Sequence, residues 1–256
     1  MERDLHIHTF FSPCAEPTMS FPAILAAAEK AGLMEIGLTD HPHRPGLARH
    51  HRALDDARDS HRGPVHVWIG AELEVESLGR LVVPPPELPL ADYVIAAASH
   101  YDIVGRPPVA DLKDPVAWAD RLLTDLENVS GSGAHAIAHP FYAYALMRAV
   151  PGYPTARMDD ILDEIRPRRV ERLVEMLARE AIALEISPRM CMHLGLESFI
   201  ETTYGMARQA GVKFALGSDS HRTATIGHLG QAEGLVQRLG LSPADLWSPT
   251  LACRRK

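Results

Sequence analysis

The chain has 256 residues, 46% of them hydrophobic, which gives enough apolar material for the core of one large domain. A formal net charge of -7 argues against nucleic acid or an anionic membrane surface as a general partner, and no apolar run is long enough to span a membrane. The three cysteines do not form a disulfide framework, so we expect a single domain over residues 1–256, located in the cytoplasm, with a loose tail from about residue 249.

Seven apolar, β-rich runs alternate with helical patterns along the chain. The runs lie at residues 3–8, 34–39, 65–75, 92–98, 134–139, 181–187 and 212–218. Helices are predicted at residues 20–32, 114–129, 158–180 (interrupted by Pro167), 196–211 and 230–240. This alternation indicates parallel strands joined by crossover helices, in a closed barrel or in a doubly wound open sheet. Residues 79–83 are interpreted as a hairpin return, followed by a proline-rich loop.

Residues able to bind metals or anions follow the carboxyl ends of all seven runs. In chain order these residues are His6 and His8, Asp40 and His41, Glu72, His100, His139, Glu185 with Arg189, and Asp219 with His221. His6 and His8 share one face of their strand because side chains alternate. The carboxyl ends of parallel barrel strands form one rim, where active sites are built, so we expect these side chains to meet.

Each motif alone has an ordinary structural explanation. Asp40 and Asp219 are typical helix-cap residues, and His139 could be a core histidine before a turn proline. Taken together, however, they would crowd imidazoles and carboxylates on one rim, and these groups are the preferred ligands of divalent ions. The sequence therefore predicts a centre of two or three divalent ions, with zinc, manganese or iron as candidates.

The motifs "HIH", "TDH", "GAE", "ASH", "AHP" and "SDSH" occur in this order between residues 4 and 221. In this respect the chain resembles the PHP (polymerase and histidinol phosphatase) family, and within it the histidinol phosphatases. The resemblance implies a distorted (β/α)7 TIM-like barrel whose trinuclear metal site cleaves phosphoesters.

The resemblance also implies which residues hold each metal. The first site would use His6, His8, Glu72 and Asp219; the second would share Glu72 and add His100 and His139; the third would use His41, His221 and a ligand from the loop after "HIH". That loop ligand is often a histidine in the family, whereas Cys14 stands at the matching position here. A Cys14 thiolate would favour a soft ion such as zinc; a plain buried thiol, or His43 in its place, are the alternatives.

Three further residues are candidates for catalytic roles. Arg189 and Arg222 could clamp a phosphate, because guanidinium binds phosphate through two hydrogen bonds; solvated surface arginines are the alternative. Asp40 is expected to orient a water or a ligand histidine rather than to bind metal.

The remaining histidines and carboxylates are expected to be solvated or structural. We expect solvated side chains at His50, His51 and His61, and structural or surface roles for His135, His193 and His228. Glu74 and Glu76 share a strand face with Glu72, but the family pattern selects Glu72.

The expected function is hydrolysis of a small phosphomonoester by a metal-activated water, with histidinol phosphate as the first candidate. A phosphodiesterase or exonuclease is the first alternative, but the basic clusters at residues 166–169 and 254–256 lie away from the predicted rim. An amidohydrolase is the second, although none of the four lysines ends a predicted strand to serve as a bridging ligand. A non-catalytic PHP module is the third.

Overall fold

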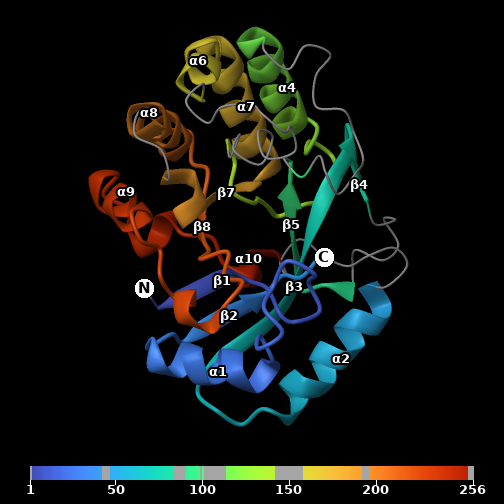
Figure 1. Ribbon diagram of the computed structural model, residues 1–256. Helices are drawn as coiled ribbons and strands as arrows, with labels where there is room; N and C mark the ends of the chain where they lie inside the picture. Colours follow the sequence, from blue (N-terminus) through green and yellow to red (C-terminus); the bar gives the residue numbers. More distant parts are fainter. Residues whose placement is uncertain are drawn as a thin grey trace.

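The computed structural model describes residues 2–41, 47–82, 90–98, 100, 114–141, 158–191 and 196–252. Seven strands pair in parallel in the order β1 (Arg3–Ile7), β2 (Glu35–Leu38), β3 (His66–Ser77), β5 (Tyr93–Ala97), β6 (Ala136–Ile137), β7 (Ala183–Ile186) and β8 (Phe214–Leu216). An eighth strand, β4 (Arg80–Leu81), returns antiparallel along β3. The strands occupy the centre of the molecule with helices around them (Figure 1), so the predicted (β/α)7 barrel and its hairpin are confirmed.

The predicted helices are present, and the structure adds α2 (Leu47–Ser60) and, at the start of the tail expected to be loose, the short α10 (Pro249–Ala252). The others are α1 (Phe21–Lys30), α4 (Pro115–Glu127), α6 (Met158–Asp163), α7 (Pro167–Glu180), α8 (Leu196–Gln209) and α9 (Ala232–Arg238). The Asp114 carboxylate caps α4 by accepting hydrogen bonds from two backbone N–H groups in its first turn, at 2.9 and 3.2 Å. Pro167 separates α6 from α7 because proline fits the first turn of a helix but not its interior. No helix in the described ranges is both long and apolar enough to cross a membrane.

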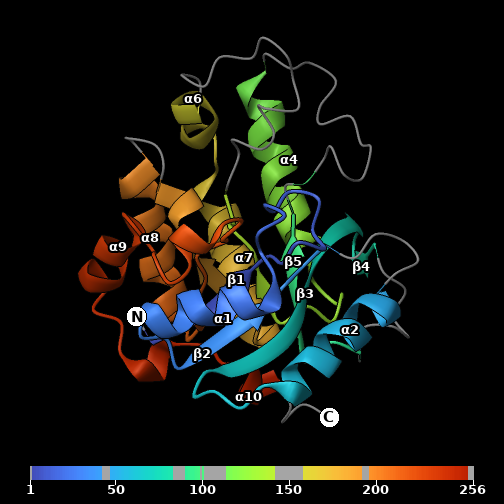
Figure 2. The same cartoon turned by 60° about the horizontal axis from the view of Figure 1, so that its bottom comes forward.

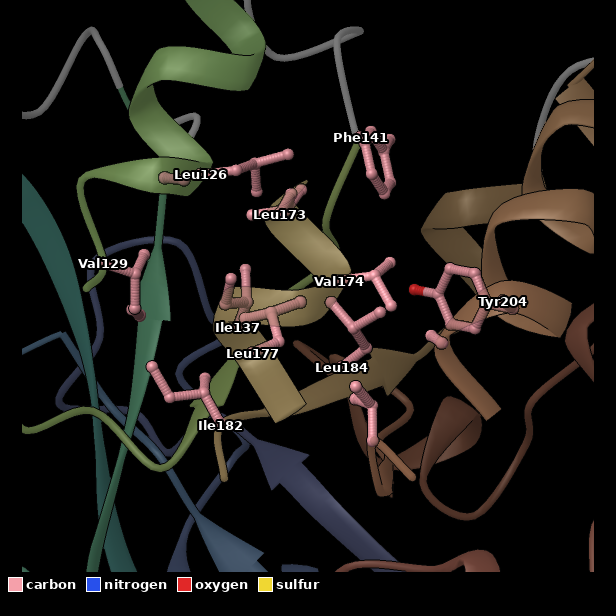
Figure 3. Close-up of a cluster of buried hydrophobic side chains, with 14 of the residues drawn as sticks. Leu126, Val129, Ile137, Phe141, Leu173, Val174, Leu177, Ile182, Leu184 and Tyr204 are labelled. Atoms are coloured by element: carbon pink, nitrogen blue, oxygen red, sulfur yellow. The ribbon is translucent and has the colours of Figure 1, made fainter. Parts of the chain in front are cut away.

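Two layers of apolar side chains hold the helices on the barrel. α1 and α2 cover the side of the barrel formed by β1–β3, whereas α4, α6, α7 and α8 cover the other side (Figures 1 and 2). On α7, Val170, Leu173, Val174 and Leu177 recur with helical spacing and are all buried. Figure 3 shows the last three of these packed with Ile137 of β6 and with other side chains of that layer.

An aromatic side chain fills the barrel interior near the amino ends of the strands. Tyr93 is fully buried, and its hydroxyl donates a hydrogen bond to the Leu5 carbonyl at 2.6 Å. Gly37 makes room for this ring, since a Cβ there would lie 1.8 Å from the Tyr93 Oη. Trp247 packs against the same ring, with centroids 5.4 Å apart. The opposite end of the barrel, at the carboxyl ends of the strands, is left for polar side chains.

The barrel closes between β1 and β8 at that carboxyl end. The His8 N–H donates to the Ser220 carbonyl at 2.9 Å, and the Ser220 N–H donates to the His6 carbonyl at 3.3 Å. The buried Asp4 carboxylate reinforces the seam by accepting from the backbone N–H groups of Ser218 and Gly227, both at 2.8 Å. Closure thus brings the first and the last motif of the chain together.

Two expectations about histidines are decided here. His51 was expected to be solvated but is only 3% exposed, because it lies one turn before buried Leu54 on the face of α2 that packs against the barrel. His135 accepts a hydrogen bond from the Val94 N–H at 3.0 Å and lies against Trp247, as expected of a structural residue. His43, His193 and residues 83–89 of the proline-rich loop lie outside the described residues.

Candidate metal centre

The expected ligands meet at the carboxyl rim of the barrel. Six of them are buried, namely His6, His8, His41, Glu72, His139 and Asp219. His100 and His221 are partly exposed beside them. Four overlapping groups bring their ligand atoms within 4.8 Å of one another: His6, His8 and Glu72; His8, Asp219 and His221; His41, Glu72 and His100; and His8, Cys14 and His41.

The hydrogen bonds of His6 and His8 fix which ring nitrogen faces the centre. His6 Nδ1 lies 2.6 Å from Glu185 Oε1, so it donates its proton to that carboxylate. His8 Nδ1 lies 3.1 Å from Ser12 Oγ, whose own hydrogen goes to Asp40 Oδ1 at 2.6 Å. His8 Nδ1 is therefore the donor in its bond to Ser12. In their neutral forms both rings then present a bare Nε2 to the rim.

These two nitrogens converge with two carboxylates on one small space. His6 Nε2 lies 3.1 Å from His8 Nε2 and 3.2 Å from Glu72 Oε2, and His8 Nε2 lies 3.2 Å from Asp219 Oδ1. Four buried acceptors this close repel one another unless a proton or a metal ion lies between them. Protons supply the positive charge when no metal does: burial lowers the pKa of His6, but the carboxylates around it outweigh burial and raise it well above its usual value. The donor set therefore fits a divalent ion.

Glu72 stands at the middle of the centre and uses its two oxygens differently. Oε2 faces His41 Nε2 at 3.0 Å, in addition to His6. Oε1 faces His139 Nε2 at 2.9 Å and His100 Nε2 at 3.9 Å. Burial raises the pKa of this carboxyl, but the imidazoles outweigh burial, His41 most of all, and hold it well below its usual range. A carboxylate ionised in this way, with one oxygen on each side, has the geometry that a bridging ligand requires.

Cys14 lies in the loop after β1 and is exposed rather than buried. Partial desolvation of its sulfur raises the pKa of the thiol, but hydrogen bonds with the side chains of His221 and His41 outweigh this and lower the pKa to about 7. His221 Nδ1 donates to the Cys14 carbonyl at 3.0 Å, and its Nε2 lies 2.9 Å from Asp219 Oδ1. A thiolate and two or three imidazoles thus surround a third position that could hold a metal.

The three candidate catalytic residues differ in where they lie. Arg189 pairs with the Asp219 carboxylate, and its Nη2 lies 3.0 Å from His221 Nε2. Arg222 is exposed, and among the described residues no carboxylate of the centre forms an ion pair with it. Asp40 turns away from the ligands: its carboxylate accepts from the N–H and the hydroxyl of Thr9, each at 2.6 Å, and from Ser12.

A model of the PHP domain family matches residues 4–189, well over half of the chain. The chain belongs to the PHP domain family. Two curated relatives of this PHP domain are 24% identical to it: a probable phosphatase of Enterobacter sp. strain 638, aligned over 93% of this chain and 85% of the relative, and the probable phosphatase YcdX of Escherichia coli, over 94% and 86%.

Solved structures share the fold of this PHP domain. The histidinol phosphate phosphatase of Lactococcus lactis, solved in complex with zinc, L-histidinol and phosphate, aligns with a TM-score of 0.66 over 94% of each chain at 20% identity. A putative histidinol phosphatase of Listeria monocytogenes aligns with a TM-score of 0.61 over 90% of this chain and 99% of its own, at 13% identity.

The structure also places against the ligand histidines residues to which the sequence assigns no role. Glu74 Oε1 lies 3.0 Å from His41 Nδ1; its alternation with Glu72 along β3 was the available signal. Burial raises the pKa of Glu74, but hydrogen bonds from His100 and His41 outweigh it and lower the pKa to about 2. Glu185 lies at the end of a predicted strand, but the sequence alone gives it no role. Ser12 carried no signal, because its importance depends on the fold of the loop after β1.

Proposed function

We propose that this PHP-family phosphatase is a metal-dependent hydrolase of small phosphomonoesters. The observation that carries the proposal is that four atoms converge: His6 Nε2, His8 Nε2, Glu72 Oε2 and Asp219 Oδ1. Each of them is an acceptor when the rings are neutral and the carboxylates are ionised. Divalent ions bound at such a centre supply Lewis acids that acidify a water and neutralise the oxygens of a phosphate.

The side chains divide into three metal positions in this proposal. His6, His8, Glu72 and Asp219 would hold the first; Glu72, His100 and His139 would hold the second; His41, His221 and Cys14 would hold the third. Glu72 would serve both of the first two positions, because its two oxygens face different imidazoles. The number of ions, two or three, depends on whether the thiolate side of the centre is filled, and its sulfur favours zinc there.

Arg189 is the proposed phosphate clamp. Its guanidinium lies at the edge of the centre, on the 3-10 turn Pro188–Cys191 that follows β7, and is about a third exposed, so an incoming phosphate can reach it. A guanidinium donates two parallel hydrogen bonds to phosphate oxygens and cannot lose its charge at neutral pH. Asp40 acts indirectly, because it holds the Ser12 hydroxyl that fixes the His8 ring. A phosphate-binding role for Arg222 stays a prediction.

Histidinol phosphate is the first substrate to test, and nucleoside monophosphates come next. The support is the fold shared with a phosphatase whose structure contains L-histidinol and phosphate. The net charge of -7 is a second support, because a nucleic-acid substrate calls for a basic groove. The cytoplasmic location stays a prediction.

The proposal is tested by comparing turnover of histidinol phosphate, a nucleoside monophosphate, an aryl phosphate, an aryl phosphodiester and single-stranded DNA or RNA. We expect a monoester to be the best substrate and Glu72→Gln to reduce turnover at least about a hundredfold. Glu76→Gln is the matched control, because Glu76 lies on the same strand but forms an ion pair with Arg80. Processive degradation of the polymers with negligible monoester turnover would overturn the substrate class and indicate an exonuclease.

A further inference from the structure

We propose that Glu185 is a positioning residue that serves two metal positions at once, by fixing the tautomer of His6 and the backbone turn that aims His139. The inference rests on the metal centre of the proposed function. Glu185 belongs to β7 and is only 2% exposed. Its Oε1 lies 2.6 Å from His6 Nδ1, and its Oε2 accepts from the His139 N–H at 2.5 Å. It binds neither proposed metal position itself.

For His6 the contact determines which nitrogen can bind metal. The carboxylate keeps the proton on Nδ1, so the lone pair stays on Nε2, which points at Glu72 and His8. A carboxylate behind a ligand imidazole also makes the ring a better donor of electron density to the ion. If the proton moved to Nε2, the ring would present an N–H to the centre and the ion would lose this ligand.

For His139 the contact holds an unusual backbone conformation. The Ala138 N–H still follows the sheet, donating to the Ala96 carbonyl at 3.0 Å. The next residue, His139, leaves the sheet with a φ of +28°, in a backbone region that residues other than glycine rarely adopt. Its N–H is turned to Glu185 Oε2, and its ring reaches Glu72 Oε1 at 2.9 Å. Glu185 therefore stabilises the turn that brings His139 to the centre.

Gly217 is an independent sign that this contact is built tightly. A Cβ at Gly217 would lie 2.4 Å from Glu185 Oε1 and 2.5 Å from the His6 Cβ. The backbone after β8 thus closes directly over the hydrogen bond between Glu185 and His6. Any side chain larger than hydrogen at residue 217 must displace the carboxylate or the ring.

The decisive variant is Glu185→Gln, because an amide offers one acceptor where the carboxylate offers two. If the amide oxygen accepts from the His139 N–H, the amide NH2 faces His6 Nδ1 and forces the proton of the ring onto Nε2. If the amide turns round, its NH2 faces the His139 N–H, which then loses its hydrogen-bond acceptor. Either way we expect metal affinity, measured by competition with a chromophoric chelator, to fall about 10- to 100-fold.

Glu180→Gln is the matched control. Glu180 also accepts two hydrogen bonds, from the Ser130 hydroxyl at 2.6 Å and the Gly131 N–H at 2.9 Å, but it lies at the end of α7 near the amino ends of the strands. We expect the metal affinity of the Glu180→Gln variant to equal that of the wild type. A second pair of variants keeps the inference testable if Glu185→Gln misfolds. Gly217→Ala replaces no ligand but should lower metal affinity by displacing Glu185 or His6, whereas Gly205→Ala, which has open space around it, should not.

A nitrogen-15 NMR spectrum of the histidine rings separates failure of this inference from failure of the proposed function. The wild type, with or without zinc, should show a hydrogen-bonded Nδ1–H signal for His6. In Glu185→Gln this signal is lost if the amide NH2 faces His6; if the amide turns round, the signal is kept and the His139 N–H loses its acceptor. Wild-type metal affinity and an unchanged His6 signal in Glu185→Gln would overturn the role of Glu185. A wild-type protein that shows the His6 signal but takes up no metal would overturn the proposed metal centre instead.

Discussion

At the scale of single residues, the chemistry of the rim depends on which nitrogen of each imidazole carries the proton. Glu185 and Ser12 accept the Nδ1 protons of His6 and His8, so the bare Nε2 atoms meet 3.1 Å apart. The "HIH" motif shows which residues meet, because strand alternation puts both rings on one face. It does not show the tautomers, since the partner of His6 lies 179 residues further along the chain.

Metal affinity should rise with pH. In the metal-free protein the carboxylates raise the pKa of His6 and His41 well above the usual value, and Asp219 and Cys14 outweigh burial to raise that of His221 to about 9. These rings therefore carry protons at neutral pH that an ion must displace. Between pH 6.5 and 9 we expect affinity to rise by up to about tenfold per pH unit for each proton displaced, measured by calorimetry in buffers of different ionisation enthalpy. Constant affinity without proton release would contradict this prediction.

Replacing Cys14 with Ala should remove about one ion per chain and lower turnover, because its thiol, with a pKa of about 7, lies beside His41 and His221. Cys14→His is the matched variant. It restores a nitrogen ligand, so it should retain the ion but bind it with less preference for zinc over manganese. Elemental analysis of the three proteins checks this. Unchanged stoichiometry and normal turnover in Cys14→Ala would show that the thiol is not a metal ligand.

At the scale of elements, strand ends and the loops after them build the centre. The seven strands and most helices are visible in the sequence because their apolar periodicity is strong. The loop after β1 is different: the Ser12 hydroxyl contacts His8, Asp40 and the His41 N–H, and nothing local in the sequence predicts this. Likewise, His139 and Asp219 have positive φ angles, which few residues other than glycine adopt, and nothing local in the sequence predicts them at these two positions.

Ser12→Ala should destabilise the metal-free protein by roughly 1–3 kcal/mol, because two buried donors and Asp40 lose a hydrogen-bond partner. Ser60→Ala is the control: its hydroxyl donates to the Asp56 carbonyl on the exposed face of α2, and we expect a change within about 0.5 kcal/mol. Urea unfolding of the chelator-treated proteins measures both. If Ser12→Ala were as stable as the wild type, the Ser12 contacts would not hold the loop after β1.

At the scale of the whole molecule, the barrel brings motifs that are separate in the sequence together at one site. Its strands bring residues from the first and last quarters of the chain to one rim, and the seam between β1 and β8 closes through the backbone of His6 and His8. The order of the motifs predicts this assembly, because parallel strands share one carboxyl end. Burial of His51 was not predicted, since a polar helical stretch does not reveal which face packs inward.

The central claim is that the rim is a multinuclear metal centre bridged by Glu72, and elemental analysis of purified protein after metal supply tests it most directly. We predict two or three ions of zinc, manganese or iron per wild-type chain. Glu72→Gln should lose more than one of them, because one carboxylate faces both groups of imidazoles. One ion or none in the folded wild-type protein would contradict the account.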